Sequence, residues 1–367
     1  MKTYDEWNRI FASQDLYEFN ADESGILWLK IKSLIRAEIL NFMQQKLAFK
    51  LISKTQSQKF REIYNLVLSG KITQRDIDFV LAQYNNDEIK TLKQNFSLIE
   101  SELYKMNYFA WGGDSSNSLD KQIISFVKEI YKYDEILHKI DNDIAQNVKN
   151  YTLSSWYNNW SAILTEHIFK SHSKVISAVG KIKSVDFFIE NIPIDLKITY
   201  FPKEFLKLQR KANGLQNELS LLKNIAKKLT LNFDKESKEE IVKYQITQQI
   251  LDSNNAEAIL QLKNLKAQNA KIIQEAIADK HTLIKWLYEN QGEMRFGAEN
   301  RIFIVLIDLD DFTQAWKLKR NFTLIKPKIL EYLDNFRHEI FLKNIVEFEF
   351  NQKRYKALAD IIFVVKR

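Results

Sequence analysis

The stretch SVDFFIENIPIDLKITYFP, residues 184–202, decides how we interpret the fold of this chain. It contains two short apolar runs rich in Val, Ile and Phe, which predict two β-strands joined by a turn. Asp186 interrupts the first run, and Asp195 and Lys197 interrupt the second. Charged groups are rarely buried without a partner or a task, so this hairpin is the first place to look for a functional site.

The length of the turn decides where Asp186 lies relative to the other two charges. Side chains alternate across a strand, so Asp195 and Lys197 share one face. A two-residue turn puts Asp186 opposite Asp195, a four-residue turn puts it opposite Lys197, and a three-residue turn moves it to the other face. We expect the four-residue turn, because Pro193 cannot donate a hydrogen bond to a strand ladder. The two strands are expected at 184–189 and 192–201.

Two carboxylates and a lysine on one face of a hairpin create an electrostatic conflict that a cation would relieve. Directly opposed Cβ atoms lie about 4.5–5.5 Å apart. Carboxylates that close repel each other, so one of them tends to take up a proton. Magnesium prefers oxygen ligands and is commonly held by one or two carboxylates together with a substrate phosphate. A neighbouring lysine can then orient the attacking water or stabilise charge that grows on the phosphorus.

The order Asp186, then Asp195–Leu196–Lys197, resembles the catalytic motif of the PD-(D/E)XK nuclease superfamily, which includes many type II restriction endonucleases. Members often carry a Glu on the preceding helix, and Glu166 in LTEHIF stands at that place, on the shoulder of the helix's apolar face. Val185 replaces the name-giving Pro, and a long insertion after the motif departs from the minimal core.

This resemblance implies a magnesium-dependent endonuclease that hydrolyses double-stranded DNA, and such enzymes are commonly homodimers. The catalytic residues that it implies are Asp186, Asp195, Lys197 and Glu166. The ligands that it implies for Mg²⁺ are Asp186, Asp195, the Leu196 carbonyl and Glu166.

The rest of the chain predicts an α+β protein with a restriction-endonuclease-like core, in which helices flank a mixed sheet. Residues 1–150 have helical patterns throughout and are expected to form an N-terminal helical domain. Residues 151–367 are expected to form the nuclease-like domain, with a helical insertion at about 203–290. The run IFIVLID, residues 302–308, predicts a strand buried on both faces, and NIVEFEF and ALADIIFVVK predict two more.

Composition narrows the function classes further. The net charge of +7 over 367 residues suits a polyanionic partner. The absence of cysteine excludes disulfides, zinc–thiolate sites and a thiol nucleophile. There is no apolar run of about 18 residues, so we expect no membrane span, and the charged start MKTYDEWNRIFASQD favours a cytoplasmic location over secretion.

Two alternatives remain open. In the first, the hairpin charges form an ordinary cross-strand ion pair, and the protein is a non-catalytic DNA-binding or interaction protein with a degenerate nuclease core. In the second, Asp308 and Asp310 after the buried strand resemble the metal site of palm-type nucleotidyl transferases, although the required second acidic hairpin is absent from the sequence after them. A basic stretch that follows is expected to contact DNA phosphates, through Lys317, Lys319, Arg320, Lys326 and Lys328.

Overall fold

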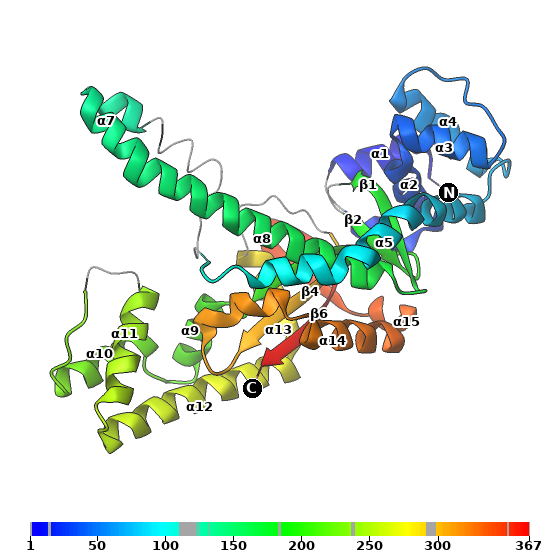
Figure 1. Cartoon of the computed structure of the whole chain (residues 1–367). Coiled ribbons are helices and arrows are strands. Elements are labelled where there is room, and N and C mark those ends of the chain that lie inside the picture. The colour runs from blue at the N-terminus through cyan, green and yellow to red at the C-terminus, as the bar shows by residue number, and fades with distance from the viewer. Residues whose placement is uncertain are drawn as a thin grey trace.

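The computed structural model describes residues 2–13, 16–109, 123, 125–130, 132–182, 185–235, 239–290, 299–350 and 352–366. These residues build an α+β fold around one six-stranded sheet with the strand order β1-β2-β3-β4-β6-β5 (Figure 1). The strands are β1 (Val175–Ile182), β2 (Val185–Ile189), β3 (Ile192–Tyr200), β4 (Arg301–Asp308), β5 (Ile345–Phe350) and β6 (Lys353–Lys366).

The sheet is mixed, as the sequence predicts. Strands β1, β2 and β3 form an antiparallel meander, β3, β4 and β6 run parallel to one another, and β5 returns antiparallel to β6. All eight residues of β4 are buried, which confirms the expectation of a strand covered on both faces. Parallel neighbours need long crossover connections, and the helical insertion supplies the one between β3 and β4.

The hairpin of β2 and β3 closes with a two-residue turn, so our expectation of a four-residue turn is wrong. Ile189 pairs with Ile192, and the turn residues Glu190 and Asn191 have φ angles of 45° and 72°. Positive φ at both central residues is typical of a type I′ turn. The pair beside such a turn is hydrogen-bonded and the next pair, which includes Pro193, is not. The missing N–H of Pro193 therefore costs β2 no hydrogen bond.

Strand β1 is not predicted by the sequence patterns described above. Its sequence VISAVGKI mixes Val and Ile with Ser177, Ala178 and Gly180, so its apolar signal is weak. It lies at the edge of the sheet, and its pairing with β2 is irregular between Ser177 and Ile182.

The N-terminal part is helical, as expected, but it shares a hydrophobic core with the sheet. Trp28, Ile31 and Leu34 of α2 belong to the same buried cluster as Val185 and Phe188 of β2. The helix α2 is buried on nearly every side, which fits its apolar sequence. The helices are α1 (Tyr4–Ala12), η1 (Tyr17–Ala21), α2 (Glu23–Leu34), α3 (Ala37–Lys46), α4 (Gln56–Leu68) and α5 (Gln74–Tyr104).

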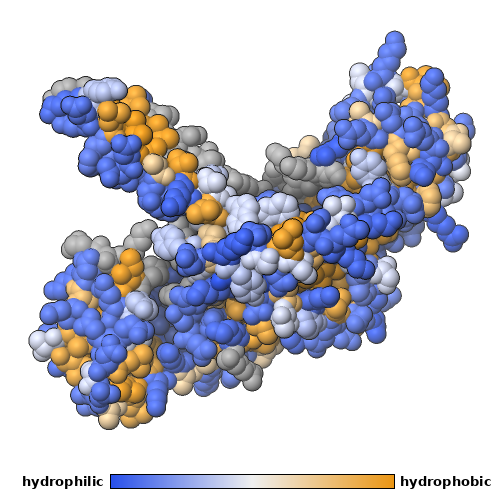
Figure 2. All heavy atoms as spheres, in the orientation of Figure 1, coloured by the Kyte–Doolittle hydropathy of each residue, from blue (hydrophilic) through white to orange (hydrophobic). Residues whose placement is uncertain are grey.

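A long helical arm connects this part to the sheet. It consists of α7 (Tyr133–Lys139), the π-helix η2 (Ile140–Ile144) and α8 (Ala145–Lys170), so the expected boundary at residue 150 falls inside α8. Figure 1 shows α7 and the first half of α8 projecting away from the sheet. Apolar side chains gather along this projection in Figure 2, and Tyr133 is 73% exposed.

The second half of α8 covers one face of the sheet. Leu164, Ile168 and Phe169 pack against Ile194 of β3 and Ile304 of β4. The C-terminal helices complete this face: η3 (Phe312–Arg320), α14 (Phe322–Asn335) and α15 (His338–Phe341). Because Ile194 and Leu196 face this core, the alternate residues Asp195 and Lys197 face the other side of β3.

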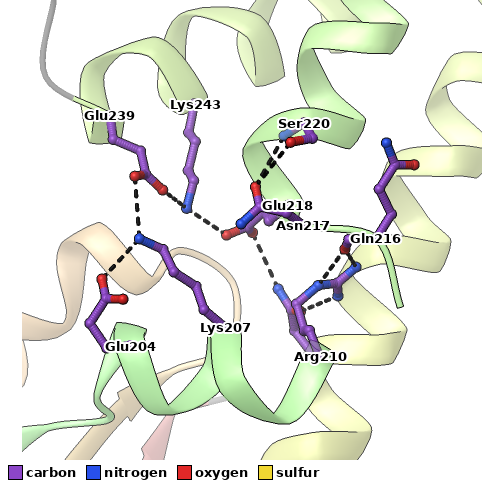
Figure 3. Close-up of polar contacts among 10 residues, drawn as sticks. Glu204, Lys207, Arg210, Gln216, Asn217, Glu218, Ser220, Glu239 and Lys243 are labelled. Atoms are coloured by element: carbon purple, nitrogen blue, oxygen red, sulfur yellow. Dashed lines mark hydrogen bonds and ion pairs between the residues drawn. The ribbon is translucent and has the colours of Figure 1, made fainter. Parts of the chain in front are cut away.

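The helical insertion expected at about 203–290 is confirmed. Its helices are α9 (Lys203–Ala212), α10 (Glu218–Lys228), α11 (Glu239–Asp252), α12 (Ala256–Ala278) and α13 (Lys280–Asn290). Helices α9, α12 and α13 cover the second face of the sheet, against Phe303 and Val305 of β4. A continuous series of ion pairs fastens α9, α10 and α11 together (Figure 3). It runs through Glu204, Lys207, Glu239, Lys243 and Glu218.

Candidate active site

The three charged residues of the hairpin lie together. The register of β2 and β3 pairs Phe187 with Ile194, and Asp186 and Asp195 are the residues directly beyond this last pair. The Asp186 carboxylate accepts a hydrogen bond of 2.8 Å from the Leu196 backbone N–H. The Lys197 ammonium lies 2.8 Å from Asp195 Oδ1. The side chains of the Asp-x-Lys motif and of the preceding Asp therefore meet on the same part of β3.

Asp195 also pairs with Arg301, a residue that sequence reasoning did not identify. Its Oδ2 lies 3.1 Å from Arg301 Nε, and the Arg301 Nη2 lies 2.9 Å from Glu299. The Arg301 guanidinium also rests 4.8 Å from the ring centroid of Tyr288. Asp195, Arg301 and Glu299 are all more than 90% buried, so these contacts fix the orientation of the carboxylate. The signal for Arg301 was its position directly before the buried strand, but only the parallel register of β3 and β4 brings it beside Asp195.

Asp186 is the ionisable group that this arrangement perturbs most clearly. Burial, together with the negative charges of Asp195 and Glu166, raises its pKa from 3.8 to about 6. The hydrogen bond from Leu196 and the charge of Lys197 act in the opposite direction but do not cancel the increase. A carboxylate close to two other carboxylates holds a proton or a metal cation more tightly than an isolated carboxylate does, because the positive charge relieves the repulsion.

Glu166 is close enough to act on Asp186 electrostatically, as its expected position on the shoulder of α8 requires. Its side chain is 26% exposed and its Oε2 lies 2.9 Å from the Lys170 ammonium, one helical turn away. The charge of Glu166 is therefore balanced locally by a lysine on its own helix.

These residues fit one cation held by two carboxylates and completed by water and substrate, rather than a closed protein cage. Within the residues that the structure describes, no group of three or more His, Cys, Asp or Glu side chains comes close enough to hold a metal by itself. Both oxygens of Asp195 already have positively charged partners. A cation at Oδ1 must therefore displace the Lys197 ammonium, whose side chain is 31% exposed and has room to move. Magnesium commonly uses so few protein ligands when a phosphate supplies the rest.

The basic stretch expected to contact DNA divides into two groups. Lys317, Lys326 and Lys328 are exposed. Arg320 is buried and donates to the carbonyl oxygens of Leu103 and Met106, at 2.8 and 2.6 Å, so it fastens the end of α5 to η3.

Lys319 has an enclosed ammonium that donates to Asn158 Oδ1 at 2.7 Å, and burial lowers its pKa to about 8. It is half-buried and lies 5.2 Å from the ring centroid of Tyr200. In this structure Lys319 thus links η3 to α8 and β3 rather than projecting into solvent.

The acidic residues after β4 cap and close the strand end. Asp308 Oδ1 accepts hydrogen bonds from the backbone N–H groups of Asp310 and Asp311, and Oδ2 lies 2.9 Å from the Lys366 ammonium. Asp310 points outward, with its side chain 69% exposed. The contacts of Asp308 are those of a residue that stabilises the turn after a strand, and they explain its burial.

No protein-family model, characterised protein or solved structure matches this chain. Among the described residues, no helix is both long and apolar enough to cross a membrane. The assignment of a function therefore depends on the geometry of the site.

Proposed function

We propose that the protein is a magnesium-dependent DNA endonuclease, of the kind found among type II restriction enzymes, which hydrolyses phosphodiester bonds in double-stranded DNA. The observation that carries the proposal is the meeting of Asp186, Asp195 and Lys197, with a pKa of about 6 for Asp186. Strongly perturbed acids beside a lysine are more frequent at functional sites than elsewhere.

The order of elements supports the resemblance to the PD-(D/E)XK superfamily. A helix that carries Glu166 precedes a hairpin that carries Asp186, and the next strand carries Asp195 and Lys197. The sheet is mixed and has helices on both faces. No part of this order depends on the long insertion, which follows the motif strand and leaves the hairpin intact.

In this proposal Asp186 and Asp195 would hold Mg²⁺ together with water and the substrate phosphate. The resemblance to the nuclease superfamily adds the Leu196 carbonyl and Glu166 as further ligands, and Glu166 would have to move closer to take that role. The bound ion supplies charge stabilisation at the phosphorus and a more acidic water. Lys197 orients that water and neutralises charge on the non-bridging oxygens, since its ammonium is already beside Asp195. Arg301 holds the Asp195 carboxylate from the other side.

Binding of the DNA backbone falls to exposed cations outside the site. Lys317, Lys326 and Lys328 are the part of the basic stretch that can reach phosphates, because Arg320 and Lys319 bond within the fold. The resemblance to restriction enzymes adds a homodimer to the proposal, because two such sites can cut the two strands together.

The test is cleavage of high-complexity genomic DNA by the purified protein. Wild type with Mg²⁺ is expected to produce discrete fragments, and chelation by EDTA is expected to stop the reaction. Lys197→Ala and Asp195→Asn should lose cleavage by at least a hundredfold, whereas Asp310→Asn, an exposed aspartate outside the site, should cut like wild type. Cleavage that survives in both site variants would reject the proposal.

A non-catalytic DNA-binding protein is the second candidate, and the ion pairs on both oxygens of Asp195 favour it. Such a site would not exchange Lys197 for a cation. Titration with Mg²⁺ or Mn²⁺ then leaves the melting temperature unchanged, whereas a functional site gains stability as the cation saturates it.

A further inference from the structure

A cavity of about 220 Å³ lies between the helical insertion and the segment that follows β4. Helices α9, α10, α11 and α12 all contribute to its wall, and residues 309–312 complete the wall after the strand. None of the four residues proposed for catalysis lines this cavity. An apolar cavity of about 150 Å³ can hold a benzene molecule, so this one has room for a benzene ring with a short side chain.

Helix α11 gives the cavity apolar wall that the fold leaves uncovered. On one side of α11, Val242, Ile246 and Ile250 are buried in a cluster with residues of α10 and α12. On another side, Tyr244 and Leu251 line the cavity and remain 53% and 43% exposed. A helix with apolar side chains on two sides is usually covered on both. Tyr244 and Leu251 therefore indicate a place for an apolar molecule.

The other walls are mainly apolar as well. Leu206 of α9 and Leu262 and Leu265 of α12 are buried side chains that line the cavity. Leu309 and Phe312, which follow β4, are partly buried and line it too. A flat ring between these walls would remove apolar surface from water on both of its faces.

The lysines in the wall have hydrogen-bond donors to spare. The Lys243 ammonium, which Figure 3 shows between Glu239 and Glu218, lies 2.8 Å from each carboxylate, so two of its three N–H groups are used. The exposed Lys266 of α12 also lines the cavity. Among the residues that the structure describes, its ammonium bonds only to the Asp310 carbonyl, at 3.3 Å. An ammonium donates and never accepts, so a molecule beside Lys266 must bring an acceptor, and a negatively charged one bonds most strongly.

We propose that this cavity binds a small aromatic monocarboxylate, with its ring against Tyr244 and Leu251 and its carboxylate beside Lys266. A single negative charge suits the wall better than a phosphate, because the carboxylates of Glu218 and Asp311 also line the cavity and repel additional charge. Such sites typically combine mostly apolar walls with a few oriented polar groups. The inference does not depend on the proposed nuclease activity.

A molecule bound here would connect two separate hydrophobic cores. Helix α11 contributes to the cluster of α10, α11 and α12, whereas Phe312 packs against the cluster that covers the sheet. Because both line the cavity, the bound molecule should stabilise the contact between the outer helices of the insertion and the rest of the fold.

The experiment titrates the full-length protein calorimetrically with three compounds of nearly the same shape. 3-Phenylpropionate is an anion, 3-phenylpropionamide is neutral and 3-phenylpropylamine is a cation. Wild type should bind the carboxylate with a dissociation constant of about 1 mM or tighter, bind the amide at least about fivefold more weakly, and show no binding of the amine. Benzoate and 4-phenylbutyrate test shorter and longer spacings of ring and carboxylate.

Two variants separate the two contacts, each with a control on the same helix. Lys266→Met keeps the apolar stem and removes the charge, so it should bind the carboxylate and the amide equally. Lys263→Met lies outside the cavity wall and should behave like wild type. Tyr244→Ala should weaken the carboxylate and the amide by at least about fivefold, and Ile241→Ala, also outside the wall, should not. All four positions are exposed, so the variants should fold normally.

Equal affinity of wild type for 3-phenylpropionate and its amide would overturn the inference, as would a failure of all three aromatic carboxylates to bind. Binding that survives both Lys266→Met and Tyr244→Ala would place the carboxylate elsewhere and would also overturn it. Hydrogen exchange gives a second measurement. Saturating 3-phenylpropionate should slow amide exchange in α11, and unchanged exchange there would contradict the proposed position.

Discussion

Replacing Asp186 with Asn tests whether the hairpin is strained by charge, as a site built for a cation should be. The carboxyl has a pKa of about 6 in the folded chain and an ordinary value of 3.8. Below pH 3.8 the Asp186 carboxyl is neutral in the folded and the unfolded chain, so its ionisation does not change the unfolding free energy. As the pH rises through 6, the unfolded state has already lost its proton, and the folded state must carry a crowded charge. Stability from this group is therefore lost between about pH 4 and 7.

The size of the effect follows from the pKa difference. The rise of the Asp186 pKa from 3.8 to about 6 corresponds to at most roughly 3 kcal/mol of unfolding free energy, because solvent screens part of the charge of this partly exposed side chain. Asp186→Asn is nearly isosteric, and its side-chain oxygen can still accept from the Leu196 N–H. We therefore compare the unfolding free energy of the variant with that of wild type at two pH values. This difference should be up to about 3 kcal/mol larger at pH 7.5 than at pH 4, in favour of the variant.

Chemical denaturation at a series of pH values measures this difference, with Asp310→Asn as the matched control that should follow the wild-type profile. Adding Mg²⁺ at pH 8 should stabilise wild type by about 1.4 kcal/mol at ten times the dissociation constant, and should leave Asp186→Asn unchanged. Parallel pH profiles for wild type and Asp186→Asn would refute the reasoning, because the carboxyl would then carry no electrostatic cost.

Three other predictions concern packing and charge outside the hairpin. Lys30→Met should lower the unfolding free energy by roughly 3 kcal/mol in denaturant titrations, because the fully buried ammonium bonds to Asp78 and Asn191 at 2.6 Å each. Arg320→Ala should lower the melting temperature, whereas Lys317→Ala should leave it unchanged. Lys317→Ala should instead reduce the slope of log binding constant against log salt concentration for DNA by about one. Equal effects of the two variants on both measurements would contradict this division. Gly25→Ala should lower the melting temperature, with about 1–3 kcal/mol lost, because an added Cβ would lie 2.7 Å from the Trp7 ring.

Much of the fold is readable in local patterns. The continuous apolar run of β4 predicts its burial, and alternation within β3 predicts that Asp195 and Lys197 share a face. The helical insertion has the expected limits, and amphipathic periodicity is clearest in its first two helices, α9 and α10.

What the sequence could not supply was the choice between nearly equal local geometries and the pairing of distant segments. The turn at Glu190 and Asn191 lacks glycine, so nothing in it indicated positive φ at both positions. The error followed from treating Pro193 as an obstacle, although its N–H would have pointed away from β2. Arg301 reaches Asp195 only because two strands separated by the whole insertion pair in one register.

The position of β6 has a consequence for how the chain acquires this fold. β6 lies between β4 and β5 but is synthesised after both. Until it arrives, the nascent chain carries an apolar strand with one unpaired edge, which is a template for association with other chains. Such non-local parallel pairing also forms slowly. Pulse-labelled hydrogen exchange should therefore find the amides of β4 protected late in folding. The yield of folded protein should depend on protection of the unpaired edge of β4 until β6 is synthesised.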